Sequence, residues 1–480
     1  MPAIERSAHS ATRLRSGLVA VGGLLTLAII TLYLQRYGLS TLAVEHAAVR
    51  GWLDGDGLYA YREPGSQAGA AQPPAAAMLL APLTLLPLRA AGWLLALAGV
   101  AALLLTTLVV AGPVARRHGR RRGPFVLAAA SLALLAEPVR AAIGLGRPEL
   151  LILALLAADI VGLRRAARTL HLPHRTRFAS RFTRPRFDPS APGPLRRVFD
   201  PLSPGPLRRV FDPSSPGPLR RAFDPSSSSP LRRAWANGSW AGAGTGLAAA
   251  LSPTALLFVV YLLVTRQRRA AVTALATAAA VTVAALVAAP AETLAWYGTT
   301  MWELDRPAPI SDIHNQSLAG AMARLYDFPA PPVLVWFSFG ILLLAVGLIR
   351  ARSAHSDNDE VAAFTLIGLT AAVAGPVTTA AESLWLLPAV LVLADAGLRR
   401  RLGGRLPRSK RLTGTGYLVA AALGYLTLVV TPEWSLIWNV PAFTLILLVN
   451  ALPWRHGTPA LPTRQPVPAR RAAIPLPRGG

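Results

Sequence analysis

Long apolar runs separated by short polar segments make up most of this chain. Many of them approach the roughly 20 residues that an α-helix needs to cross a bilayer. Shorter runs at residues 75–88 and 242–264 contain prolines, which is typical of broken, re-entrant or hairpin helices. The pattern predicts an all-α, polytopic transmembrane protein with about 10–13 membrane helices, counting these short pieces. The clearest long runs are residues 17–34, 91–112, 270–289, 333–349 and 413–431.

Basic residues lie in the short segments between the apolar runs, and they set the expected orientation. ARRHGRRRG at residues 115–123 and RRRLGGRLPRSKR at 399–411 follow apolar runs directly. In membrane proteins the cytoplasmic loops carry the excess of Arg and Lys. We therefore expect a multi-pass plasma-membrane protein with both termini in the cytoplasm and with external loops at 35–74 and 291–331. The first apolar run has no clear cleavage site after it and is interpreted as a retained signal anchor.

Composition favours a protein surrounded by membrane lipids over a nucleic-acid-binding protein. Hydrophobic residues make up 53% of the chain and charged residues only 15%, and the mean hydropathy is +0.43. The formal net charge of +26 comes from arginines that cluster in segments between the apolar runs and in an Arg-rich tail, whereas a nucleic-acid-binding protein gathers them on one folded surface. The chain has no cysteine, and no group of residues has metal-ligand spacing. We therefore expect no disulfide, no metal and no cofactor.

Changes in composition divide the chain into four parts. Residues 1–163 and 237–453 form two transmembrane parts, each with one of the external loops. Residues 164–236 contain Pro-, Ser- and Arg-rich repeats of 12 residues, such as PLRRVFDPSSPG. These repeats have too few large apolar side chains to form a core, so they predict a disordered cytoplasmic insert. Residues 454–480 are predicted to form a disordered, basic cytoplasmic tail.

The expected topology places two long loops and two charged turns on the same outer face. Loops of this length are usually functional, so their polar residues are the candidates for a site. The candidates are Glu45, Asp54 and Asp56 in the first loop, Arg147 and Glu149 in a short turn, and His314, Asn315 and Gln316 in the second loop.

Several segments resemble glycosyltransferase family 87, the polyprenyl-phosphate-mannose-dependent mannosyltransferases. WLDGDGLY, followed by PP, an apolar run and LLP, looks like the opening of the family. GLGRPELLILALLAADIVGLRR resembles the family's glycine–glutamine–asparagine turn, and GLAAALSPTALLFVVYLLVTRQRRAA resembles its lysine-containing hairpin. WYGTTMWELDRPAPISDIHNQSLAGAMARL matches best, and GPVTTAAESLWLLPAVLVLADAG resembles the last core motif. The resemblance covers most of the chain except the insert and both ends.

The resemblance implies a GT-C membrane fold and a transfer reaction outside the cell. The donor would be a polyprenyl-phosphate sugar, with mannose as the family's sugar, and the acceptor a cell-envelope lipid or glycan. The chain departs from the family pattern mainly at charged positions. The departures are Glu45 for the usual Asp, Gln72 for Tyr, Arg147 and Glu149 for Gln and Asn, Ala250 for Lys, and Ala380, Ala381 and Glu382 for an Asp-His-His run.

Sugar transfer from a polyprenyl phosphate needs a carboxylate that accepts the proton of the acceptor hydroxyl, and cations that bind the phosphate. Glu45 is the candidate base, with an ordinary interfacial acid as the alternative. His314 is the candidate that binds the phosphate or orients the base, although a single loop histidine often has no such role. Arg147 would hold the phosphate with two hydrogen bonds, unless it is paired with Glu149 or Glu137.

The other candidates would bind substrate. Asn315 and Gln316 suit sugar hydroxyls, with helix capping as the alternative, and Glu149 lies beside the arginine of its turn. Asp54 and Asp56 either bind substrate or shape the turn that a DGDG sequence favours. An alternative function is an inactive relative that serves as a membrane scaffold or lipid-binding partner. A transporter would show paired half-chain repeats, and these are not convincing here.

Overall fold

The computed structural model describes residues 21–64, 68–171, 237–402 and 408–455. Within these ranges the chain forms helices and connecting segments, and its one extended pairing is an isolated antiparallel bridge between Arg62 and Gly69. The all-α, polytopic architecture that the apolar pattern predicts is confirmed. The insert from residue 172 onward and the tail from residue 456 lie outside the described residues, so the expected disorder stays a prediction.

Five helical segments of the described chain are long and apolar enough to cross a membrane. Two further helix pairs pass the same test together but are sharply bent, by 73° and 71°. The long segments are α4 (Leu88–Arg117), α13 (Arg268–Ala288), α16 (Val333–Ser356), Ala381–Leu402, which joins η5 (Ala381–Trp385) to α18 (Leu386–Leu402), and Arg411–Val430 within α19 (Arg408–Val430). The bent pairs are Val21–Tyr37 with α2 (Ser40–Asp54), and α5 (Arg122–Leu135) with α6 (Glu137–Leu145).

Further helices complete the described chain. The expected total of ten to thirteen membrane helices is reached only if the bent pairs and the short apolar helices are counted. The short apolar helices are Pro74–Leu85, which joins α3 (Pro74–Leu80) to η1 (Ala81–Leu85), Pro253–Val264, which joins η3 (Pro253–Ala255) to α12 (Leu256–Val264), α17 (Glu360–Ala374) and α21 (Val440–Ala451). The remaining helices are α7 (Glu149–His171), α11 (Ala243–Leu251), α14 (Pro290–Gly298), η4 (Thr300–Trp302), α15 (Leu318–Leu325) and α20 (Glu433–Ile437).

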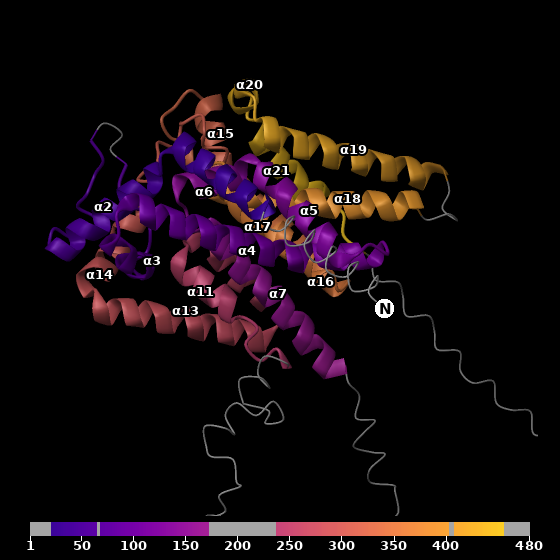
Figure 1. Ribbon diagram of the computed structural model, residues 1–480, viewed down its shortest axis with the longest axis horizontal. Coiled ribbons are helices and arrows are strands. Elements are labelled where there is room, and N and C mark those ends of the chain that lie inside the picture. The colour runs from indigo at the N-terminus through magenta and orange to yellow at the C-terminus, as the bar shows by residue number, and fades with distance from the viewer. Residues whose placement is uncertain (1–20, 65–67, 172–236, 403–407, 456–480) are drawn as a thin grey trace, which may run out of the picture.

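The core surrounds α17, which is buried along almost its whole length and lies in the middle of the bundle (Figure 1). Aromatic side chains fill the space beside it: the Phe258 ring lies 5.4 Å from Phe364 and 5.2 Å from Trp385, measured between centroids. The outer helices instead expose large apolar side chains, such as Leu334 on α16 and Leu423 on α19. Continuous apolar surface of this kind is typical of helices that face lipid.

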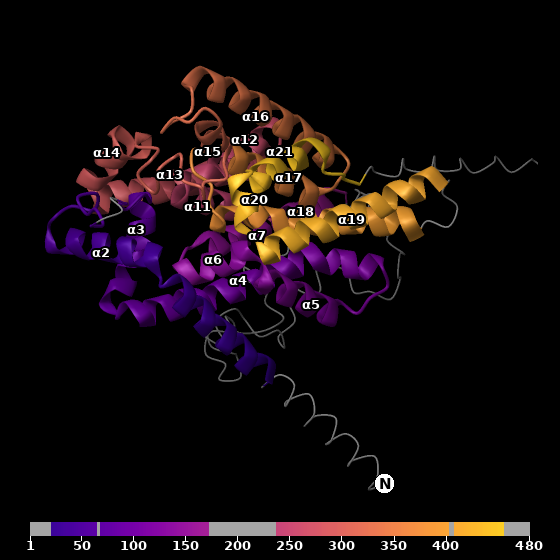
Figure 2. The ribbon, with the colours of Figure 1, turned by 90° about the horizontal axis from the view of Figure 1, so that it is seen from above.

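The two ends of the bundle differ in structure. Figures 1 and 2 show α2, α3 and α14 together at one end, while the adjoining ends of α18 and α19 lie at the other. The end that holds α2, α3 and α14 therefore also holds the loop segments that follow α2 and α14. We take Val21–Tyr37 as the spanning part of the first bent pair, with α2 turned out of the span at this end.

Some local expectations were wrong. α7 continues to His171, into the segment expected to be disordered. Near the end of the described chain, α20 and α21 are separate helices with a break at Asn439. Leu58 is 1% exposed and belongs to a small core under the first loop. Trp296 is also buried, where it stacks on Tyr59 with ring centroids 5.8 Å apart.

Candidate active site

α2 is held close to the turn that carries Arg147. The chain bends before α2 at Gly38 and Leu39, both with positive φ, and the Leu39 amide donates to the Gly144 carbonyl oxygen at 3.0 Å. At Gly146, with φ 72°, a side chain would meet the Leu42 Cβ at 2.7 Å. Glycine at this position therefore allows α2 and the α6–α7 turn to approach closely.

Glu45 lies on the buried side of α2 and is only 5% exposed. One carboxylate oxygen, Oε1, accepts a hydrogen bond from the Ala71 amide at 3.4 Å, while Oε2 is buried without a partner among the described residues. Burial raises the pKa of Glu45 to about 7, although the Ala71 amide and the positive charge of Arg147 oppose the shift. A carboxylate with such a pKa is suited to accept a proton near neutral pH.

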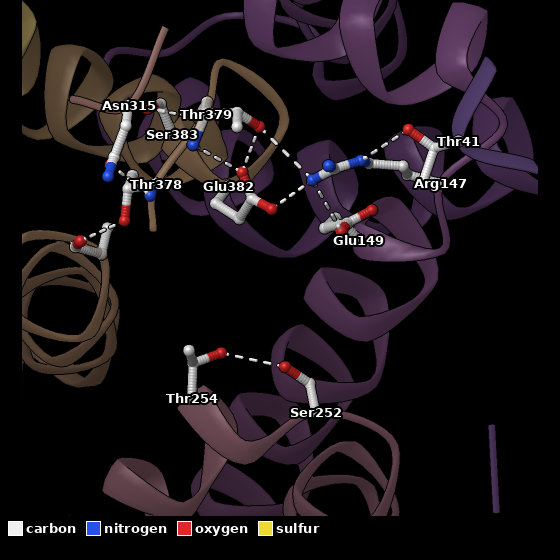
Figure 3. A network of polar contacts seen from close by, with 11 residues as sticks. Thr41, Arg147, Glu149, Ser252, Thr254, Asn315, Thr378, Thr379, Glu382 and Ser383 are labelled. Carbon is white, nitrogen blue, oxygen red and sulfur yellow. Dashed lines mark hydrogen bonds and ion pairs between the residues drawn. The ribbon is translucent and has the colours of Figure 1, made fainter. Parts of the chain in front are cut away.

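Arg147 is the centre of a polar cluster that joins three parts of the chain (Figure 3). Its Nε donates to the Thr41 hydroxyl at 3.3 Å, and its Nη1 donates to a Glu382 carboxylate oxygen. The same Nη1 lies 3.7 Å from Glu149 Oε1. Thr41 is one helical turn before Glu45 on α2, so the two side chains share a face of that helix and Glu45 lies beside the cluster.

Glu382 completes this cluster, and sequence reasoning did not include it among the site residues. Its Oε2 accepts from the Thr379 amide at 2.7 Å and from the Thr379 hydroxyl, which fixes the carboxylate against Arg147. Glu149 Oε2 is buried and unpartnered among the described residues. The expected alternative of an Arg147–Glu149 ion pair is thus present, but the shorter contact is to Glu382, 235 positions away.

His314 does not join this cluster. Its side chain is 71% exposed, and its Nδ1 and backbone amide lie 3.1 and 2.6 Å from the same oxygen of Asp312. This is a local turn in which the aspartate accepts from the backbone two residues later. The catalytic role expected for His314 therefore finds no geometric support in the described structure.

Asn315 and Gln316 hold the second loop in place. The Asn315 amide nitrogen donates to the carbonyl oxygens of Ile310 and Pro376, at 2.9 and 3.0 Å, and its oxygen accepts from two backbone amides, those of Ser317 and Thr378. All of its hydrogen-bonding capacity is used, so it has none for a sugar. Gln316 donates to two carbonyl groups but leaves its Oε1 buried and unpartnered within the described chain.

Asp54 and Asp56 lie in an exposed turn at the end of α2. Gly55 ends the helix with φ 103°, and the Asp56 amide donates to the Gly51 carbonyl oxygen at 2.9 Å. This is the glycine-terminated end that helices commonly adopt. The structure therefore favours the alternative in which these aspartates shape the turn.

Arg306 is a second residue that sequence reasoning missed, because nothing in its local pattern marks it. It comes from the second loop and is 4% exposed. Its guanidinium contacts the first loop at Ala70 and Tyr59, and it also binds Glu303, which reaches Arg62 at 2.8 Å. The two loops expected to share one face are thus in direct contact, close to Glu45.

The described residues contain no group of three or more His, Cys, Asp or Glu side chains placed to hold a metal ion. The site is therefore a buried carboxylate beside an arginine with two further carboxylates, under two loops at one end of a helical bundle. Such an arrangement suits proton transfer and the binding of an anionic or hydroxyl-rich group in a membrane protein.

The chain belongs to glycosyltransferase family 87, whose model matches residues 72–173 and 228–379, together more than half of the chain. The matched residues include Arg147, Glu149, Asn315 and Gln316, whereas Glu45 precedes them and Glu382 follows them. No solved structure matches the chain.

The curated relatives are mycobacterial enzymes, and the similarity covers part of each. A polyprenol-phosphate-mannose-dependent alpha-(1-2)-phosphatidylinositol mannoside mannosyltransferase of Mycobacterium tuberculosis is 33% identical over 32% of this chain and 36% of the relative. A protein of the same name from Mycolicibacterium smegmatis is 29% identical over 32% and 37%. A phosphatidylinositol pentamannoside mannosyltransferase of Mycobacterium tuberculosis is 26% identical over 38% and 41%. The chain thus aligns with well under half the length of each of these relatives.

Proposed function

We propose that this protein transfers a mannosyl group from a polyprenyl-phosphate donor to a cell-envelope lipid or glycan at the outer face of the plasma membrane. Membership of family 87 and the printed names of the relatives support the donor and the reaction class. The observation that carries the proposal is the position of Glu45. It is a buried carboxylate with one oxygen unpartnered among the described residues, and it lies next to Arg147, which contacts Thr41 on α2 and Glu149 at the start of α7.

In the proposed reaction the acceptor hydroxyl oxygen attacks the anomeric carbon of the donor sugar. The bond from that carbon to the phosphate oxygen breaks, the polyprenyl phosphate leaves, and the hydroxyl proton passes to Glu45 Oε2. Attack from the side opposite the phosphate inverts the configuration of the sugar. The phosphate is a competent leaving group, so we propose that the reaction needs neither a metal nor a cofactor.

Arg147 is the proposed partner of the departing phosphate. It can form charge-assisted hydrogen bonds to phosphate oxygens, provided that Glu382 or Glu149 gives up part of its contact. Glu149 Oε2 lies on the same cluster and is available to accept a sugar or acceptor hydroxyl. Asn315 and Gln316 serve the site indirectly, because they fix the second loop.

The test is transfer of radiolabelled mannose from the polyprenyl donor into extractable lipid or glycan, measured on purified protein. General-base help is worth about 10²–10⁴-fold, so Glu45→Gln should lower turnover by that factor while donor binding is retained. Glu433→Gln, an exposed acid at the start of α20, is the matched control and should leave transfer unchanged.

Two outcomes would contradict the proposal. Undiminished transfer by Glu45→Gln would remove Glu45 from the role of base. No transfer by the unmodified protein, with donors and acceptors broadly sampled, would favour an inactive relative that acts as a membrane scaffold or lipid-binding partner. The neutralisation of Arg147 by Glu382 is the structural feature that agrees with this second function.

A further inference from the structure

The first loop folds back over Glu45 through the segment at residues 68–73. Gly69 of this segment forms an isolated antiparallel bridge with Arg62, and Ala70 is packed in a small core with Val49 and Leu58. The Ala71 amide then reaches Glu45 Oε1. The geometry around the carboxylate therefore depends on where residues 69–71 are held.

Arg306 of the second loop holds this segment. Its Nε donates to the Ala70 carbonyl oxygen at 2.7 Å, and the Gly69 amide donates to the Arg306 carbonyl oxygen at 3.3 Å. Its Nη2 donates to the Tyr59 carbonyl oxygen at 2.5 Å, and its guanidinium carbon lies 5.5 Å from the centre of the Tyr59 ring. Both sides of the first loop are thus bound to one side chain.

The Arg306 guanidinium is buried, and each of its three nitrogens has a partner, since Nη1 binds Glu303 at 2.7 Å. A buried guanidinium is tolerated when its donors are satisfied, and its planar fork fixes the directions of those hydrogen bonds. A lysine would supply a charge but not the same fixed geometry. The contacts therefore define the position of the Ala70 carbonyl, one residue before the amide that binds Glu45.

We propose that Arg306 is a positioning residue for the site: it ties the second loop to residues 69–71 of the first and so sets the place of Glu45 and closes the loops over it. This inference rests on the proposed function for the role of Glu45, but the loop closure itself can be tested without any activity. The side chain acts through the backbone and through its charge, and it does not touch the reacting atoms.

The first test measures loop closure. Because the chain has no cysteine, Ala70→Cys provides a single thiol at a position that is 1% exposed. We expect this thiol to react slowly with an impermeant maleimide when Arg306 is present, and at least about tenfold faster with Arg306→Ala. Asp54→Cys, in the exposed turn, should react equally in both backgrounds. Arg62→Ala, which breaks the surface pair with the same Glu303, should leave the Ala70→Cys rate low.

The second test separates position from charge through the pH dependence of transfer. The groups that face Glu45 are Arg147, Glu149 and Arg306, together with the Tyr59 ring. Arg306→Ala should lower kcat about 10- to 100-fold with little change in KM, because the base is misplaced. It should also move the acidic limb of the profile to lower pH, because open loops let water reach Glu45 and reduce the burial that raises its pKa, an effect larger than the loss of the Arg306 charge. Arg306→Lys should keep the limb near its original pH and lose part of kcat.

The two tests fail separately. If the Ala70→Cys thiol reacts equally fast with and without the Arg306→Ala substitution, the loop-closing role is overturned, whatever the activity. Faster labelling with an unchanged pH profile and kcat would show that Arg306 holds the loops but does not position Glu45. Absence of transfer in the unmodified protein would count against the proposed function and leave the labelling result to decide the loop contact.

Discussion

At the scale of residues, the main feature of the site is an excess of carboxylates around one guanidinium. Glu45, Glu149 and Glu382 all surround Arg147, so a single positive charge faces three acids. Like charges at such distances cannot all ionise in a buried place, and the group that is most desolvated takes a proton first. Glu45, with a hydrogen bond from a single amide and one bare oxygen, is the member best suited to exchange a proton near pH 7.

The raised pKa of Glu45 predicts a pH dependence with a definite sign. Only the ionised carboxylate accepts a proton, so transfer should fall as the pH drops through about 7. Stability should change in the opposite sense. Since the folded pKa lies above the ordinary value of 4.5, Glu45 stabilises the fold at acidic pH, and this contribution is lost as the pH rises through about 7. Thermal unfolding of the unmodified protein and of Glu45→Gln across pH 4–9 measures the difference, and identical pH profiles for the two proteins would contradict it.

The Arg147 cluster predicts a stability effect that does not depend on activity. Arg147→Ala leaves two partly buried carboxylates without their cation and should cost up to about 3 kcal/mol, less than for a fully buried pair because Glu382 keeps some exposure. The variant should also bind the polyprenyl donor more weakly. Arg147→Met with Glu382→Leu removes both charges and should recover part of the stability. A double variant that is as unstable as the sum of the singles would show that the pair is not coupled.

The sequence could point to Glu45 and Arg147 because a charge next to an apolar run is visible in one dimension. It could not point to Glu382 or Arg306 as members of the site. Their contacts join residues more than 230 positions apart, and no local pattern records them. Asn315 and Gln316 were placed in the right loop, but their role depends on which backbone groups surround them, and that follows only from the fold.

At the scale of elements, close approach of small residues holds the bundle together. α11 packs on α13 where Gly242 and Gly246 face the backbone of Ala270 and Ala274. Interfaces between membrane helices commonly use small residues four positions apart, because they let the backbones come close. α11 is only nine residues long, so this contact contributes much of its stability.

Two matched glycine variants test this packing. A Cβ at Gly246 would overlap the Ala274 carbonyl, which belongs to the backbone and cannot swing away, so Gly246→Ala should lower the melting temperature. Gly416 in α19 has open space around it, and there alanine should be neutral or stabilise by up to about 1 kcal/mol through helix propensity. Thermal unfolding in detergent compares the two, and equal effects would mean that the α11–α13 contact is looser than described.

Helices were predictable where a long apolar run had no interruption, as in α4, α13 and α16. Bends were harder to predict, because hydropathy records what a segment is made of but not its direction. The break before α21 depends on Asn439, which adopts a left-handed conformation with φ 54° and whose side chain accepts from Arg324. Asparagine tolerates this conformation, but its presence in an apolar run does not by itself predict a break.

At the scale of the whole molecule, the polar features are divided between the two ends. The two loops and the Glu45–Arg147 site lie where α2 and α14 gather. Two other ion-pair groups lie elsewhere. Arg117 and Arg399 bind Asp395 at 2.6 and 3.3 Å and join α4 to α18. Arg455, after α21, binds Asp359 at the start of α17 at 2.9 Å. The arginines that are expected to face the cytoplasm thus lie at different helix ends from the Glu45–Arg147 site.

The last prediction concerns which end faces out. α4 has 30 residues and is therefore about 45 Å long, more than the roughly 30 Å of a hydrocarbon core. If α4 spans the membrane, the site near its first residue and Arg120 just after its end lie on opposite sides. Arg306 ties the two loops together, which requires Glu63 and Asp305 to share one side. Single cysteines at 63 and 305 should react with an impermeant maleimide in intact cells, because the arginine-rich segments are expected to stay inside. Cysteines at 120, and at 208 and 405 outside the described residues, should react only after permeabilisation. Labelling of 305 from the cytoplasmic side alone would place the site inside and exclude a reaction at the outer face.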